Sequence, residues 1–302
     1  MVGKTINILE FPTNLGLRKR PQDLEPGVKL LPEWFRKHSF HKHINPQQIV
    51  VLNPPEYTME MDEESGVLNA NMVIRYALEQ SEFFSKYLNE DAFSIVLGGD
   101  CSILIGNALA LKQKGNYGLF FLDGHTDYLL PKHSASKQVA AMELAIVTGL
   151  GHGKLTDIQN LKPYFNETHI WCVGNRELDV DTIETIENSK IHYFDLWQLR
   201  KIGIEECIIQ FFQMVEKNNL DGFLIHLDAD VLNDEIMPAV DARQPDGLTY
   251  SELTEILAHL LSSPKAIGME ITILNPDLDK EGHFTSELVS HLTRVINTSR
   301  ST

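Results

Sequence analysis

The chain has 302 residues, 43% of them hydrophobic, so it can bury a large core as one big α/β domain or as two smaller ones. No tail, linker, internal repeat or low-complexity segment divides it, and we expect a single domain over residues 1–302. Its 42 acidic and 26 basic residues give a formal charge of -16, which repels phosphate backbones and anionic membranes. We therefore expect neither nucleic acid nor a membrane as a partner.

Two further features of the sequence predict a cytoplasmic location. The longest apolar runs fall far short of the roughly 18 residues that span a bilayer, and the N-terminal segment MVGKTINILEFP has none of the parts of a secretion signal. The cysteines Cys101, Cys172 and Cys207 are too few and too scattered to form a disulfide framework, as is typical of a reducing compartment.

Short and mostly unbroken apolar runs alternate with amphipathic stretches along the chain, as in a parallel sheet that is covered on both faces. We expect eight strands, near residues 6–11, 48–52, 93–99, 118–123, 169–174, 191–195, 223–228 and 266–271. Helical patterns lie between them, at residues 69–89, 102–114, 138–149, 204–218, 249–262 and 284–297. This alternation predicts an α/β fold, a single three-layer domain with a mainly parallel sheet of about eight strands.

Side chains of the types that bind metals follow the apolar run GLFFL (118–122), where the expected strand ends at the carboxyl edge of the sheet. Asp123, His125 and Asp127 come at every second residue, and an extended segment would point all three side chains the same way. Two carboxylates and one imidazole would then converge. The alternative is a solvated turn with a chance histidine.

A second strand, in FLIHLDAD (223–230), ends in Asp228 and Asp230. Two carboxylates that leave a buried strand on one side repel each other unless a cation lies between them. The alternative is a helix N-terminus, where acids are common, but Pro238 shortly afterwards makes a helix start unfavourable.

Two other strand ends carry weaker signals. Cys101 follows Gly98 and Gly99 at the expected start of a helix, although a cysteine alone is more often a small buried residue. Glu270 ends the strand at 266–271, and alone it could be a surface acid. The non-periodic segment 231–247 is predicted to be a loop that caps a site.

In this order, the runs resemble the arginase and agmatinase family, the ureohydrolases. Family members carry Gly-Gly-Asp-His-Ser, then Asp-Ala-His-x-Asp, then Ser-x-Asp-x-Asp, and later a glutamate in or close to Met-Glu-x-Asn-Pro. The corresponding segments are GGDCS (98–102), DGHTD (123–127), HLDAD (226–230) and MEITILNP (269–276), and PDGLTYSEL (245–253) looks like a Gly-Gly-Leu-Thr-Tyr segment of the family. The resemblance covers most of the chain from about residue 93 onward.

The resemblance implies a binuclear manganese site and the arginase-like fold. Its six ligand positions fall on Cys101, Asp123, His125, Asp127, Asp228 and Asp230. Carboxylates and imidazole suit Mn²⁺, and two ions ~3.5 to 4 Å apart lower the pKa of a bridging water. In the family, the resulting metal-bridging hydroxide attacks the carbon of a guanidinium or amidine and breaks a linear C–N bond.

The resemblance also implies roles for residues outside the ligand set. Asp127 would orient the hydroxide as well as bind metal, and Glu270 would hold the guanidinium through paired charge-assisted hydrogen bonds. Asp179 falls near a family position that touches the amino end of the substrate. Relatives assemble as trimers or hexamers, so a homo-oligomer is expected.

Three departures from the family pattern affect the expected chemistry. Cys101 replaces a histidine ligand, and its softer thiolate makes Zn²⁺ or Fe²⁺ possible there. Gln138 stands in the stretch where arginases carry a proton-shuttle histidine, and an amide cannot exchange a proton at pH 7. The nearby His133 and His152 are expected on the surface.

The third departure is in the capping loop, where Asp241 and Arg243 replace a threonine-rich turn of arginases. There, an arginine could receive a substrate carboxylate and an aspartate an amine, or the two side chains could pair with each other. The sequence therefore predicts a metal-dependent hydrolase of a linear guanidino or amidino compound, with the substrate left open. The alternatives are a catalytically impaired ureohydrolase-fold binding protein and a formimidoylglutamase-like amidine hydrolase.

Overall fold

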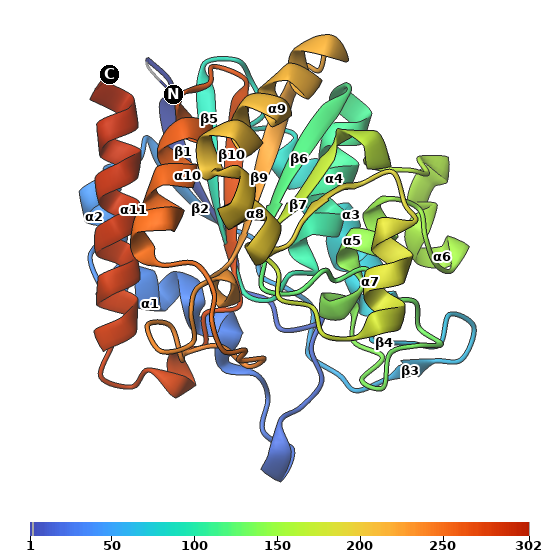
Figure 1. Ribbon diagram of the computed structural model, residues 1–302. Coiled ribbons are helices and arrows are strands. Elements are labelled where there is room, and N and C mark those ends of the chain that lie inside the picture. The colour runs from blue at the N-terminus through green and yellow to red at the C-terminus, as the bar shows by residue number, and fades with distance from the viewer. Residues whose placement is uncertain (2, 302) are drawn as a thin grey trace.

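A computed structural model describes residue 1 and residues 3–301, and its centre is an eight-stranded sheet (Figure 1). The strands are β1 (Thr5–Phe11), β2 (Gln48–Val51), β5 (Ala92–Gly98), β6 (Tyr117–Leu122), β7 (Ile170–Val173), β8 (His192–Phe194), β9 (Gly222–Asp228) and β10 (Ala266–Thr272). Their order is β2-β1-β5-β10-β9-β6-β7-β8, and every neighbouring pair is parallel. The expected α/β fold and all eight expected strands are confirmed.

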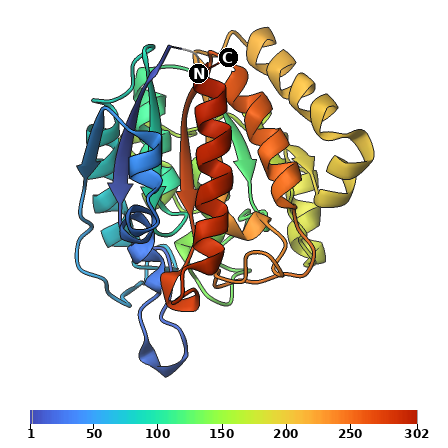
Figure 2. The same ribbon diagram turned by 90° about the vertical axis from the view of Figure 1, so that its left-hand side faces the viewer.

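Helices cover both faces of the sheet and form two separate apolar cores with it (Figures 1 and 2). One face packs against α1 (Leu31–Lys37), α2 (Phe40–Ile44), α8 (Leu196–Ile202), α9 (Ile204–Lys217), α10 (Tyr250–Ser262) and α11 (His283–Ser301). The other packs against α3 (Ala70–Phe84), α4 (Ile103–Lys114) and α5 (Glu143–Val147). Nowhere in the described part of the chain is a helix both long and apolar enough to cross a membrane.

The sequence patterns missed mainly short elements. The helices α1, α2, α8 and α7 (Val180–Glu187) were not expected, because a helix of about two turns shows too few periods to stand out. The same holds for α6 (Gly153–Thr156) and the hairpin of β3 (Met61–Asp62) and β4 (Val67–Leu68). Residues 138–149, expected as one helix, contain the 3-10 helix η3 (Val139–Ala141) and the short α5.

The four central strands, β5, β10, β9 and β6, bring distant segments of the chain together at one edge of the sheet. Gly99, after β5, needs to be glycine, because a Cβ there would lie 1.6 Å from the main-chain oxygen of Thr13 in the loop after β1. That loop projects beyond the carboxyl edge (Figures 1 and 2). Residues 231–247, after β9, form the expected loop, except that its first residue still belongs to the short 3-10 helix η6 (Ala229–Val231).

Candidate metal centre

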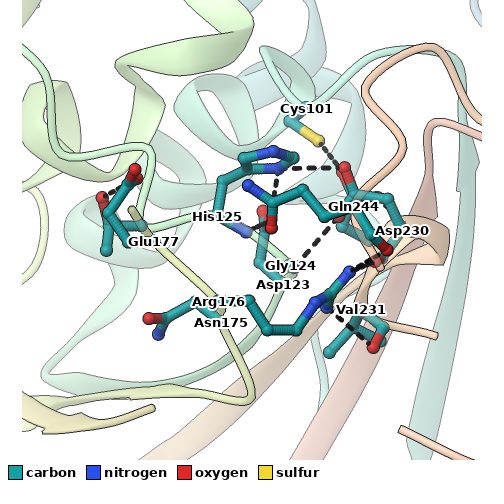
Figure 3. A network of polar contacts seen from close by, with 12 residues as sticks. Cys101, Asp123, Gly124, His125, Asn175, Arg176, Glu177, Asp230, Val231 and Gln244 are labelled. Atoms are coloured by element: carbon teal, nitrogen blue, oxygen red, sulfur yellow. Dashed lines mark hydrogen bonds and ion pairs between the residues drawn. The ribbon is translucent and has the colours of Figure 1, made fainter. Parts of the chain in front are cut away.

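The ends of β6 and β9 bring together the two acidic motifs of the sequence. Ligand atoms of Asp123, His125 and Asp230 lie within 4.8 Å of one another, and His125 Nδ1 is 3.0 Å from Asp230 Oδ2 (Figure 3). The extended geometry expected for residues 123–127 is wrong, because β6 ends at Leu122 and Asp127 has a left-handed φ of 43°. The convergence comes instead from a tight turn, in which His125 N–H donates to Asp123 Oδ1 at 2.7 Å.

Cys101 joins this cluster from the loop between β5 and α4. Its Sγ atom is fully buried, 2.8 Å from Asp228 Oδ2 and 3.1 Å from Thr272 Oγ1. Together with Asp123, His226 and Asp228 it forms a second group of possible ligands, again within 4.8 Å. The six ligand positions that the family resemblance implies therefore lie around one point of the sheet edge.

Glu143 adds a carboxylate that the sequence gave no reason to single out. It begins α5, is fully buried and faces the carboxyl of Asp127, with which it can share a hydrogen bond only while one of the two groups is protonated. One ligand atom from each of Cys101, Asp123, Asp127 and Glu143 lies within the same 4.8 Å limit. The sequence pattern of its segment predicts an amphipathic helix. Glu143 belongs to no motif, and its spacing from the other acids gives no reason to select it.

Burial dominates the electrostatics of the cluster. It raises the pKa values of the carboxyl groups and of the thiol, and neighbouring carboxylates add to the effect, at Cys101, Asp123, Asp127, Glu143 and Asp228. Asp230 differs: burial alone would raise its pKa, but His125 and Arg176 lower it overall. His125 in turn has its pKa raised to about 9, because the Asp230 carboxylate outweighs the effect of burial.

The donor set fits divalent cations. Among the described residues, the buried oxygens Asp123 Oδ2, Glu143 Oε1 and Glu143 Oε2 have no hydrogen-bond partner. Carboxylates with the imidazoles of His125 and His226 suit Mn²⁺, and the thiolate adds affinity for softer ions such as Zn²⁺ or Fe²⁺. A cation among these groups would replace the missing donors and favour the charged carboxylates.

The expected substrate contact at Glu270 needs correction. Glu270 is fully buried inside β10, where it accepts from Asn107 Nδ2 and lies 2.5 Å from His226 Nδ1. His226 Nε2 lies 3.8 Å from Asp123 Oδ2, beyond hydrogen-bond distance, so Glu270 holds a possible metal ligand, His226, beside the cluster. The family glutamate stands two residues before the asparagine of its Asn-Pro pair, and the residue two before Asn275 is Ile273, which lines the cavity described next.

A cavity of about 600 Å³ opens above the cluster. His125, Asp127, Asp228 and Asp230 line it on the metal side, and Arg18, Lys19, Arg20 and Pro21 of the projecting loop line it on the other. Gln138 also lines the cavity, and its Oε1 accepts a hydrogen bond from the main-chain N–H of Arg18 at 2.7 Å. This bond joins the projecting loop to the segment that contains Gln138. His133 and His152 are not among the lining residues.

The structure separates the two capping-loop residues. Asp241 lines the cavity and accepts from Asn275 Nδ2 at 2.8 Å, and burial raises the pKa of its carboxyl. Arg243 lies outside the lining and pairs with Asp234 at 3.1 Å. The prediction that Asp241 and Arg243 pair with each other is therefore wrong. The prediction that Arg243 receives a substrate carboxylate is also wrong, because Arg243 is not in the cavity wall.

Asp179 is also placed differently from the expectation that it touches substrate. It caps the N-terminus of α7 and accepts from Thr182 N at 2.9 Å and Thr182 Oγ1 at 2.8 Å. Its exposed carboxylate is not part of the cavity lining. The cap fixes the side chain, because an Asp at this position satisfies a free helix N–H.

Arg176 is a supporting residue that sequence reasoning missed. Its guanidinium donates to the main-chain oxygens of Asp230 at 2.9 Å and Val231 at 3.1 Å, and Gly124 N–H donates to Asp230 Oδ1 at 3.0 Å (Figure 3). These bonds tie the turn after β6 to the turn after β9. Nothing in the segment 173–179 distinguished this arginine from a surface one.

Comparison with known proteins agrees with the fold and with the family that the motifs indicate. The model of the arginase family matches residues 13–297. An arginase of Staphylococcus aureus (strain MRSA252) is 29% identical over 294 residues, 95% of each chain. The native arginase structure of Bacillus caldovelox superposes with a TM-score of 0.86 at 24% identity, over 97% of this chain and 98% of that one.

A formimidoylglutamase structure from Bacillus subtilis shares the fold at a TM-score of 0.70 and 17% identity, over 98% of this chain and 87% of that one. Since the family model spans nearly the whole chain and the acidic motifs meet at one sheet edge, the chain belongs to the arginase family, the ureohydrolases, which act on linear C–N bonds.

Proposed function

We propose that the chain is a metal-dependent hydrolase that cleaves a linear C–N bond of a guanidino or amidino compound. The observation that carries the proposal is the convergence of possible ligands on Asp123 beside a cavity. Asp123 belongs to the group with His125 and Asp230 and to the group with Cys101, Asp127 and Glu143. Two overlapping groups that share a carboxylate suit a pair of ions.

Two divalent ions, with Mn²⁺ as the first expectation, would lower the pKa of a water molecule between them and so supply a nucleophile near neutral pH. Asp127 lines the cavity and belongs to a ligand group, and in this proposal its carboxylate would orient that water toward a substrate carbon. Arg176 and Gly124 hold Asp230 in position. Glu270 holds the ring of His226, a further possible ligand, beside Asp123 from within the sheet.

Arginine itself is a poor candidate substrate for this cavity. Ile273 stands where the family motif places the glutamate that holds a guanidinium, and an isoleucine offers no hydrogen bond to it. Gln138 cannot return a proton to a leaving amine as a histidine does. We therefore expect arginine to be hydrolysed slowly, if at all.

A second candidate is the hydrolysis of an amidine that carries an acidic tail, and the basic wall of the cavity favours it. Lys19 pairs with Asp23 at 2.9 Å and Arg20 with Asp277 at 2.7 Å. The Arg18 guanidinium, in contrast, has no hydrogen bond or ion pair to any residue that the structure describes. It is free to receive a substrate carboxylate, and Arg18→Ala should raise KM for acid-tailed substrates about tenfold with little change in kcat.

The test is a metal analysis joined to a substrate panel. Purified protein loaded with Mn²⁺ would be assayed with arginine, agmatine, 4-guanidinobutyrate and N-formimidoylglutamate, with urea, formamide and ammonia as readouts. We expect close to two ions per chain and turnover of at least one compound other than arginine, and Asp228→Ala should lose both metal and activity. Folded protein that is isolated without metal and stays inactive after Mn²⁺ is added would contradict the proposal.

Cys101→His separates a retuned enzyme from a binding protein without catalysis. In an enzyme, the imidazole should raise Mn²⁺ occupancy and turnover, because it is a ligand that Mn²⁺ accepts more readily than a thiolate. In a binding protein, the substitution should change no turnover. Assembly as a homo-oligomer is also proposed, and light scattering with size-exclusion chromatography would test it.

A further inference from the structure

We propose that Glu143 is an additional metal ligand, at the ion position formed with Cys101, Asp123 and Asp127. The inference rests on the proposed metal centre and deepens it, because it assigns a donor outside the six positions that the motifs supply. The ligand it takes is a divalent transition-metal ion.

The first argument is the environment of the carboxylate. Glu143 is 0% exposed, and neither of its oxygens has a hydrogen-bond donor among the described residues. The group that it faces is the carboxyl of Asp127, and the two can hydrogen-bond to each other only while one of them keeps a proton. A divalent cation would take the place of that shared proton and compensate both buried carboxylates at once.

The second argument is distance. One ligand atom from each of Cys101, Asp123, Asp127 and Glu143 lies within 4.8 Å of the other three. Donors that bind one ion at ~2.0 to 2.3 Å are at most about 4.6 Å apart. Small side-chain movements therefore suffice to place one ion in contact with all four.

The third argument is the way in which the fold presents Glu143. The N–H of Ala145, in the first turn of α5, donates to the main-chain oxygen of Asp127 at 3.3 Å. The start of α5 is thereby tied to the segment that carries the ligands of β6. Since α5 also packs against α4, which Cys101 precedes, both sides of the ion position are set by the same helix pair.

The test compares Glu143→Gln with Glu177→Gln in Co²⁺-loaded protein. Glu177 is a matched control, because its carboxylate lies near Thr126, at 3.4 Å from Oγ1, but belongs to none of the ligand groups. Metal content would be measured by mass spectrometry and affinity by competition with a chelator. The sulfur-to-cobalt absorption band reports on the ion that Cys101 binds.

We expect Glu143→Gln to lower the affinity for the ion that Cys101 binds by about tenfold or more and to alter the absorption spectrum of that ion. The second ion should be retained. Glu177→Gln should leave both ions and the spectrum unchanged. Glu143→Asp, which keeps the charge but shortens the reach, should fall between Glu143→Gln and the unchanged protein, and it serves as the readout if the glutamine variant does not fold.

Equal affinity and an identical spectrum in Glu143→Gln would overturn the inference. With turnover and two ions in the unchanged protein, that outcome would leave the proposed function intact. If the unchanged protein bound ions but hydrolysed no compound, the proposed function would fail while the ligand role of Glu143 could still be measured. Absence of any bound ion would overturn both.

Discussion

Glu10 and Glu143 are both buried glutamates, but their carboxylates have opposite surroundings. Glu10, in β1, is 3% exposed and has two basic partners, Arg36 Nη2 at 2.6 Å and His41 Nε2 at 2.7 Å. Glu143 is completely buried beside other acids, and no basic side chain that the structure describes pairs with it. The fold itself supplies the groups that compensate Glu10, whereas for Glu143 it leaves them to be supplied by a ligand.

We expect the largest effect from Asp123→Asn, because Asp123 belongs to every group of possible ligands among the described residues. Losing the shared carboxylate should remove both ions and lower kcat/KM by more than about 1000-fold, a loss of roughly 4 kcal/mol in transition-state stabilisation. Metal content and steady-state kinetics would measure it. Asp195→Asn is the control, since Asp195 caps α8 and asparagine caps a helix equally well. Two retained ions in Asp123→Asn would contradict the assignment.

The second test applies one substitution on both sides of the comparison, in metal-free protein. Glu10→Gln removes charged hydrogen bonds and should lower the free energy of unfolding by about 1.5 to 3 kcal/mol. Glu143→Gln removes an acid without a donor and should leave the free energy of unfolding unchanged or raise it. Urea denaturation in the presence of a chelator would measure both. The account fails if Glu143→Gln is as destabilising as Glu10→Gln.

The third and smallest effect is a dependence on pH. Burial raises the folded-state pKa of Asp123, Asp127, Asp228 and Glu143, so the metal-free folded protein holds more protons than the unfolded chain. Its stability should therefore fall as pH rises from about 4, the unfolded carboxyl value, through the raised folded values. The slope is at most about 1.4 kcal/mol per pH unit for each proton involved.

Saturating Mn²⁺ should reduce or reverse this slope, because the ions favour the deprotonated carboxylates. Urea denaturation between pH 5.5 and 8, with chelator and with metal, would measure the two slopes. A metal-free protein that becomes more stable over this range would show that the cluster is not the dominant titrating feature.

The strands could be predicted because each is an unbroken apolar run, and the parallel order brings their carboxyl ends together. Asp228 and Asp230 were identifiable for the same reason, since they follow one such run directly. The geometry of residues 123–127 was not predictable from alternation, because the chain leaves the sheet at Leu122 and turns. The motif therefore marked the right residues, and the turn decided how they meet.

The remaining differences come from contacts between segments that are far apart in sequence. Glu143 looks like any acid in a helical pattern until α5 packs beside Asp127, and Arg243 looks like a substrate contact until it meets Asp234. Glu270 matched a motif by its neighbour Met269, but the distance to Asn275 shows that Ile273 holds the place beside the cavity. When the spacing within a motif differs from that of the family, a residue must be assigned by its distance from both ends of the motif.

The most direct measurement is anomalous diffraction from crystals of the unchanged protein grown with Mn²⁺. The account predicts two peaks beside the cavity, one among Asp123, His125 and Asp230 and one in contact with Cys101, Asp127 and Glu143. No anomalous peak in this cluster, with its carboxylates unchanged at saturating Mn²⁺, would contradict the claim that divalent ions hold these acids together.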